Sequence, residues 1–199
     1  MREGDEPGAS ALVLEGMVAR YHALANGKRQ YLSFHLSGDL PDAQTLFLEK
    51  MDHTVCAVGK AAVALIAHED MFALFKQRPS IGFAIWRETL IDSAIFREAI
   101  TNNSSRPALA RMAHLFCELF YRARGAGTVL GDSTALPFTQ AQLGEALGMA
   151  LVTVNRLLQA LRRTGMMDFR TGLLRVMQWE RLCEIGEFDP DYLSVTDPF

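Results

Sequence analysis

The spacing of apolar residues changes near residue 67. Before that point they form short runs or alternate with polar residues, as in ALVLEG (11–16), MVARYHAL (17–24), QYLSFHL (30–36), HTVCAV (53–58) and AAVALIA (61–67). Asn26-Gly27 and Gly59-Lys60 read as turns between such runs. This pattern predicts an antiparallel β-roll of the jelly-roll kind over residues 1–78. The chain begins at what resembles an inner turn, so we expect the first strand or two of the roll to be missing.

From residue 68 onward the apolar spacing is helical. A short helix follows His68-Glu69-Asp70, and Pro79 opens a long one, SIGFAIWRETLIDSAIFREAI (80–100). Asn102-Asn103-Ser104-Ser105 is expected to stop or kink this helix, which we assign to residues 79–103. Apolar residues lie on more than one face of this helix, so more than one of its faces must pack against other parts of a protein.

A second copy of the chain is one candidate cover for the long helix, and ordinary packing within one chain is the other. For the first case we expect a dimer seam with an acid at its centre. The predicted seam residues are Ile81, Ile85, Asp92 and Ile95.

We expect a third region over residues 104–199, and its central feature is a pair of short helices. Thr139 can cap the helix QAQLGEAL (140–147), Gly148 ends it, and a second helix runs to Gly165. Two helices joined through a tight glycine turn make a helix-turn-helix. MMDFRTGLLRVM (166–177) alternates around a central turn, which predicts a β-hairpin wing, whereas 125–137 reads as a loop or small hairpin. The whole chain is therefore of the α+β class.

The distribution of charge favours DNA as a partner of this region. The chain has a formal net charge of −3, yet residues 138–181 hold six arginines and three acids, a local charge of +3. Binding to DNA phosphates depends on such a local patch. From position, Arg156 should reach a base edge, while Arg162 at the helix end and Arg170 at the wing tip should contact phosphates or lie near them.

Other chemistry finds little support. Cys56, Cys117 and Cys183 are far apart with no CxxC spacing, so we expect three reduced thiols and neither a zinc site nor a cluster. The four histidines of the roll lack the HxH spacing of a cupin metal site. Two pairs of acids could suggest catalytic carboxylates, but Asp39 and Asp42 lie in turns and Glu69 and Asp70 lie at a helix start, where acids commonly cap the backbone. We expect no cofactor, no metal and no enzymatic activity. The polar N-terminus and the lack of an apolar run of about 18 residues predict a cytoplasmic protein without a membrane span.

These residues resemble the Crp/Fnr family of bacterial transcription regulators, and the resemblance covers nearly the whole chain. The order of roll, long helix and winged helix-turn-helix matches, as does the closing GEFDPDYL (186–193). The family's helix-turn-helix pattern is matched by Thr139, Leu143-Gly144, Gly148, Thr153-Val154-Asn155-Arg156, Leu161 and Gly165.

The resemblance implies a homodimer joined along the long helix, an effector-sensing roll, a palindromic operator in double-stranded DNA, and RNA polymerase as a partner. Arg156 matches the arginine that reads a guanine, and Leu151, Val152 and Asn155 occupy the other base-facing positions. The full set of predicted DNA-binding residues is Thr139, Gln140, Leu151, Val152, Thr153, Asn155, Arg156, Arg162 and Arg170.

The sensor region departs from the cyclic-nucleotide branch of the family. That branch holds ribose and cyclic phosphate with an acid and an arginine. Here the matching positions are Ala43 or Gln44 and Asp52 or His53. We therefore expect neither cAMP nor cGMP to bind. The N-terminal cysteine cluster of the oxygen-sensing branch is missing too, and the small-molecule effector, if one exists, is unknown.

Two other functions are compatible with the sequence. One is a sensor or interaction module of the same fold that no longer reads an operator, against which Arg156 and the positive patch argue. The other is a cupin-like enzyme with a helical appendage, which the missing HxH pair disfavours.

Overall fold

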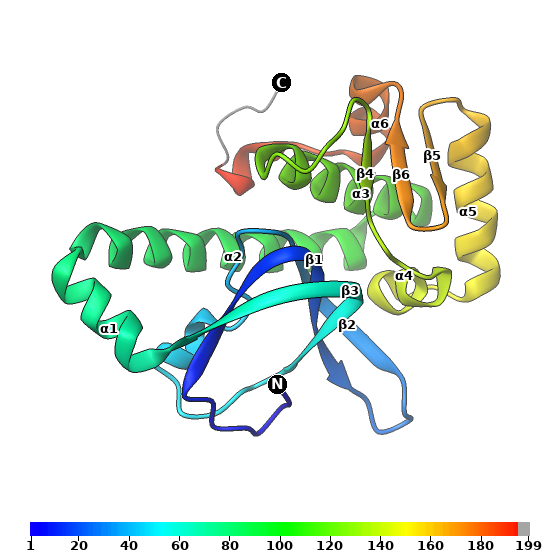
Figure 1. Cartoon of the computed structure of the whole chain (residues 1–199). Coiled ribbons are helices and arrows are strands. Elements are labelled where there is room, and N and C mark those ends of the chain that lie inside the picture. The colour runs from blue at the N-terminus through cyan, green and yellow to red at the C-terminus, as the bar shows by residue number, and fades with distance from the viewer. Residues whose placement is uncertain (195–199) are drawn as a thin grey trace. The chain divides into compact units, whose positions relative to one another are not determined.

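The computed structural model describes residues 1–194, which fall into two compact units (Figure 1). The first is Met1–Phe96 and the second begins at Arg97. The fold is α+β, as predicted, with an antiparallel sheet in each unit. The boundary between the units falls inside one helix, α2 (Pro79–Ser105), and the predicted domain limits at 78 and 103 remain predictions.

The sheet of the first unit consists of long, bent strands. Strand β1 (Ala9–Ala23) lies between β2 (Arg29–His35) and β3 (Thr54–Ala67), and both neighbours are antiparallel to it. The expectation of separate strands at 11–16 and 17–24, and again at 53–58 and 61–67, is wrong. Each pair of runs is one continuous strand, β1 or β3.

Glycine explains why these strands bend without ending. The pairing passes from Gly16 with Ala61 to Met17 with Val58, so Gly59 and Lys60 bulge out of the ladder. Gly16 has φ +79°, and a Cβ there would lie 2.2 Å from the Lys60 carbonyl oxygen. Only glycine permits this close approach of the two backbones. The predicted turn at Asn26-Gly27, in contrast, does connect β1 to β2.

Helix α1 (His68–Gln77) and the first part of α2 complete this unit. One face of α2 packs on the roll, where Ile95 is buried and the Asp92 carboxylate forms an ion pair with the buried Arg20 guanidinium. Another face is open. Phe83, Trp86 and Leu90, which we call the open stripe, are 73%, 63% and 51% exposed. Helix α2 ends at Ser105, the last residue of the run 102–105 that was expected to stop or kink it, two residues beyond the assigned end at 103.

The second unit holds the remaining helices and a small sheet. Helix α3 (Ala108–Gly125) is followed by β4 (Ser133–Ala135), α4 (Gln140–Leu147), α5 (Leu151–Arg163), β5 (Met167–Arg170), β6 (Leu173–Val176), α6 (Trp179–Gly186) and a 3-10 turn (Pro190–Leu193). The sheet order is β4–β6–β5, so the segment predicted as a loop or hairpin supplies a third strand beside the wing.

A buried polar network fixes the C-terminal segment to α3. The Tyr192 hydroxyl donates to Glu118 Oε2 at 2.8 Å, and His114 Nδ1–H donates to the Gly186 carbonyl at 3.0 Å. Burial lowers the pKa of His114; burial and the neighbouring Glu118 raise that of Tyr192. Within this unit Arg106 also pairs with Glu98, near the end of α2, at 2.6 Å. The network thus joins the end of α2, α3 and the 3-10 turn.

Candidate nucleic-acid interface

The predicted helix-turn-helix consists of α4 and α5. Thr139 and Gln142 form a capping box at the start of α4, in which the Gln142 amide donates to the Thr139 hydroxyl and the Thr139 amide donates to the Gln142 side chain. Gly148 follows α4 with φ +64°, a left-handed conformation that glycine adopts without steric cost. Helix α5 then starts at Leu151, as the sequence indicated.

A second glycine fixes how closely the turn folds back on α4. The Met149 amide donates to the Gly144 carbonyl at 2.8 Å, and a Cβ on Gly144 would lie 2.6 Å from the Met149 carbonyl oxygen. It would also contact the side chain of Val154 on α5 at 3.5 Å. Gly144 is therefore needed for space, a reason that its helical position alone does not reveal.

Helix α5 divides into a buried face and an open face. Val154, Leu157, Leu158 and Leu161 are buried, whereas Leu151 and Val152 are 51% and 81% exposed. Arg156 is exposed, and no hydrogen-bond or ion-pair partner for it occurs within residues 1–194. Thr153 and Asn155 are half-buried, and Asn155 donates to the Leu151 carbonyl at 3.1 Å.

The predicted wing is the hairpin of β5 and β6, which lies beside α5 (Figure 1). Its turn residues Thr171 and Gly172 both have positive φ, 49° and 77°, as a two-residue type I′ turn requires. The structure places Arg162 between helix and wing: its Nε lies 2.6 Å from Asp168 Oδ1, and its Nη2 donates to the Phe169 carbonyl at 3.2 Å.

Asp168 also binds Arg170, whose Nε lies 2.8 Å from Oδ2. Desolvation raises the pKa of Asp168, but the hydrogen bonds from Arg162 and Arg170 outweigh it and hold that pKa below its usual value. The carboxylate therefore neutralises part of the predicted patch. Arg175 is likewise paired, with Asp132 at 2.7 Å, an acid outside the segment used for the charge count. Sequence position could not reveal these pairings.

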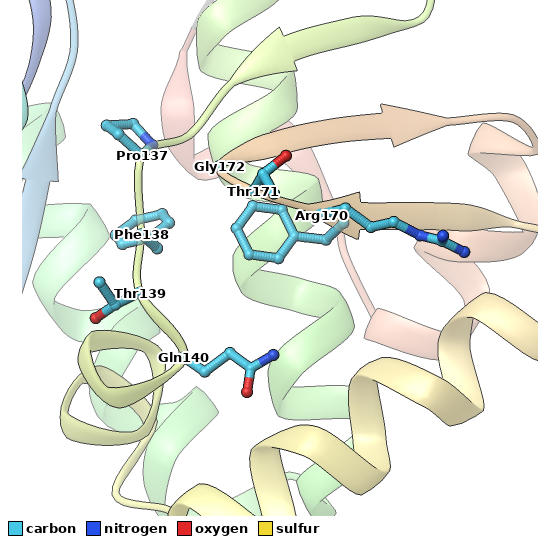
Figure 2. Close-up of a pocket in the computed structure, with 8 residues that line it drawn as sticks. Pro137, Phe138, Thr139, Gln140, Arg170, Thr171 and Gly172 are labelled. Atoms are coloured by element: carbon cyan, nitrogen blue, oxygen red, sulfur yellow. The ribbon is translucent and has the colours of Figure 1, made fainter.

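An open hollow of about 430 Å³ lies between the start of the helix-turn-helix and the wing tip. Its walls are residues 137–140 on one side and 169–172 on the other (Figure 2). Thr139 and Gln140, at the N-terminal end of α4, thus share one concave surface with Arg170. The remaining predicted residues lie on α5, in the same unit.

The sensor positions contain no free cationic group for a cyclic phosphate. Ala43 is buried, and His53 Nδ1 pairs with Asp52 at 2.7 Å. Burial and then the nearby Arg20 lower the pKa of His53. Arg20 itself was missed by sequence reasoning: it is 3% exposed, donates to the Pro41 carbonyl and pairs with Asp92. Across the part of the chain that the structure describes, no cluster of three or more His, Cys, Asp or Glu is placed to hold a metal.

Comparisons with known proteins agree with this geometry. The model of the Crp-like helix-turn-helix domain matches residues 110–185, and that of the cyclic nucleotide-binding domain matches residues 1–78. The anaerobic regulatory protein of Aggregatibacter actinomycetemcomitans is 24% identical over 187 residues, 93% of this chain and 72% of that protein. The transcriptional activator protein anr of Pseudomonas aeruginosa is 22% identical over 185 residues, 93% of this chain and 75% of that protein.

This chain is a DNA-binding transcription regulator of the Crp/Fnr family. The solved structure of FixK2 from Bradyrhizobium japonicum has the same fold, with a TM-score of 0.79 at 22% identity over 92% of this chain and 90% of that one. None of the helices within residues 1–194 is long and apolar enough to span a membrane.

Replacing glycine by alanine should change the free energy of unfolding in opposite directions at Gly144, which packs against the tight turn, and at Gly82, which does not. Gly144→Ala should lower the free energy of unfolding by roughly 1–3 kcal/mol, because its Cβ would meet the Met149 backbone oxygen. Gly82→Ala in α2 should raise it by up to about 1 kcal/mol, since its Cβ would meet only Phe75 carbons at ordinary distance. Urea unfolding of both variants measures this. Stabilisation by Gly144→Ala would refute the proposed packing.

Proposed function

We propose that this regulator binds a palindromic operator as a homodimer and reads it with α5. The exposed, unpaired guanidinium of Arg156 carries the proposal. Four of the other five arginines of residues 138–181 bind Asp168, Asp132 or Gln178, and Arg163 is the last residue of α5, away from its N-terminal turns. A guanidinium in this state can form a bidentate pair with the O6 and N7 acceptors of guanine. Its place in the second turn of α5 suits insertion of that helix into a major groove.

The residues around Arg156 define what else the helix reads. Leu151 and Val152 are exposed, apolar and next to the N-terminus of α5. Exposed apolar side chains at base-facing positions contact thymine methyl groups rather than polar base edges. We therefore expect an operator whose half-site combines a guanine with nearby thymines. The Asn155 side-chain amide donates to the Leu151 carbonyl, and both Asn155 and Thr153 are half-buried.

Phosphate contacts are assigned to the walls of the hollow. The Thr139 side chain and the backbone amide of Gln140 lie at a helix N-terminus, and Arg170 on the opposite wall is the cationic group. Arg162 has a different part in this proposal. Its bonds to Asp168 and to the Phe169 carbonyl hold the wing against α5, so it orients the phosphate-binding wing.

The homodimer is proposed to form through the open stripe of α2. Phe83, Trp86 and Leu90 follow the three- and four-residue spacing of a coiled-coil seam. Three large exposed apolar side chains on one helix mark an interaction surface. Of the residues first predicted for the seam, Asp92 and Ile95 face the roll of their own chain, while Ile81 and Ile85 are half-buried. The proposed seam is therefore the open stripe.

The roll is proposed as a sensor whose effector is not a cyclic nucleotide, since the Asp52–His53 pair occupies the position of the phosphate-binding arginine. RNA polymerase is the expected protein partner and the cytoplasm the expected compartment, as for regulators of this family.

The DNA-reading role predicts a loss of specificity for Arg156→Ala. Operator binding should weaken by roughly 10- to 100-fold, with little change on scrambled DNA, because the variant loses one base contact. Arg170→Ala is the matched control: it should weaken operator and scrambled DNA alike and reduce the salt slope by about one. Titrations of both DNAs at several salt concentrations measure this. An Arg156→Ala protein with an unchanged operator-to-scrambled ratio would show that the recognition helix is misplaced, whereas a wild type without any operator preference would support the sensor-module alternative.

The dimer proposal predicts that Trp86→Asp produces monomers. An acid in the seam places an unpaired charge in an apolar contact, which is strongly unfavourable. Ala84→Asp introduces the same acid at an exposed position outside the open stripe and should leave the dimer intact. Sedimentation at several protein concentrations distinguishes the species. Equal behaviour of the two variants would exclude the open stripe as the interface.

A further inference from the structure

Helices α3 and α6 pack against each other in opposite directions. At one end of the contact, a Cβ on Gly186 would lie 2.8 Å from the His114 amide nitrogen, so the two backbones touch there. At the other end, the Trp179 ring lies 6.2 Å from that of Tyr121 and nearly parallel to it. The two helices are therefore antiparallel: His114 on α3 lies against Gly186 on α6, and Tyr121, further along α3, lies against the earlier residue Trp179.

Between these two contacts, each helix carries one cysteine. Cys117 follows His114 by one helical turn, and Cys183 precedes Gly186 by one turn. The register therefore makes the two residues face each other, and after burial the neighbouring Cys183 thiol contributes to raising the pKa of Cys117. Both are free thiols, Cys117 completely buried and Cys183 half-buried.

We propose that Cys117 and Cys183 are a redox pair that forms a reversible disulfide when the protein meets a hydroperoxide. A disulfide needs Cα atoms within about 4.4–6.8 Å and side chains that point toward each other. The backbone contact at Gly186 brings the helices close enough, and the facing register supplies the direction. Transient disulfides of this kind are the usual form in reducing compartments.

The exposures of the two thiols set the order of the reaction. Cys183 is the one that a peroxide can reach, while burial raises the pKa of Cys117 and keeps its thiol protonated. The Cys183 sulfur attacks the peroxide, an S–O bond forms as the O–O bond breaks, and water or an alcohol leaves. The Cys117 sulfur then attacks the sulfenic sulfur. The S–S bond forms, the S–O bond breaks, and hydroxide leaves with the Cys117 proton as water.

The cross-link would enclose a defined part of the molecule. Between Cys117 and Cys183 lie β4, the helix-turn-helix and the wing, so the disulfide would close the chain around the whole DNA-reading region. Closing so long a loop restricts the unfolded chain, and the thermal midpoint of the oxidised protein should rise by roughly 5 °C or more. Neither cysteine lies on α4 or α5, so the open face of α5 stays unmodified.

The full-length protein treated with hydrogen peroxide tests the proposal. We expect a mass lower by two hydrogen atoms, a peptide that links Cys117 to Cys183, a raised thermal midpoint, and reversal of all three by dithiothreitol. Cys56→Ser is the matched control and should behave as the wild type.

Two further variants keep the proposal falsifiable. Cys183→Ser should form no linked peptide. Cys117→Ser should accumulate a sulfenic acid at Cys183 that dimedone labels; if this buried substitution prevents folding, the wild-type peptide map decides alone. Over-oxidation of Cys183 to the sulfinic acid without a link, a link through Cys56, or no reaction would each overturn the redox pair.

Discussion

The contact between Gly144 and the Met149 carbonyl is the constraint on which the DNA-reading surface depends. Any side chain at Gly144 would push the turn away from α4. The turn would then no longer place α5 against α4 through Val154. With that contact made, the buried face of α5 is fixed by its four aliphatic residues, and Arg156 can only project outward. A packing requirement at one backbone atom thus determines which side chains of α5 are exposed.

The long helix α2 has two apolar faces, one packed on the roll and one exposed. A helix with a single apolar stripe would be satisfied by its own roll. In α2 the ion pair between Arg20 and Asp92 and the burial of Ile95 use one face, yet Phe83, Trp86 and Leu90 leave another uncovered. The ion pair is mostly buried, so neither charge is easily separated from the other. It orients α2 on the roll, and this orientation decides which stripe of α2 stays uncovered.

Local signals in the sequence predicted the elements of the second unit well. The capping residue Thr139, the left-handed Gly148 and the two positive-φ residues of the wing turn act over a few residues, and each is visible in the sequence. The errors came from contacts between distant residues. Gly59-Lys60 reads as a turn in the sequence, and its role as a bulge requires knowledge of Gly16 on the partner strand. The bond from Arg162 to Asp168 is likewise a contact that the sequence does not show, and the role of Arg162 at phosphates stays a prediction. The apolar residues around α2 indicated that more than one of its faces is packed, but the sequence did not show which face packs on the roll.

The most direct test of the account concerns one contact between Arg156 and a guanine. An operator is first selected from random DNA by binding to the wild-type protein. The guanine of each half-site is then replaced by 7-deazaguanine, which lacks the N7 acceptor, and binding is measured for the wild type and for Arg156→Ala. The account predicts that the wild type loses roughly 10-fold or more in affinity at one symmetric pair of guanines, and that Arg156→Ala loses nothing further there. An equal loss for both proteins would contradict it, because another residue would then read that base.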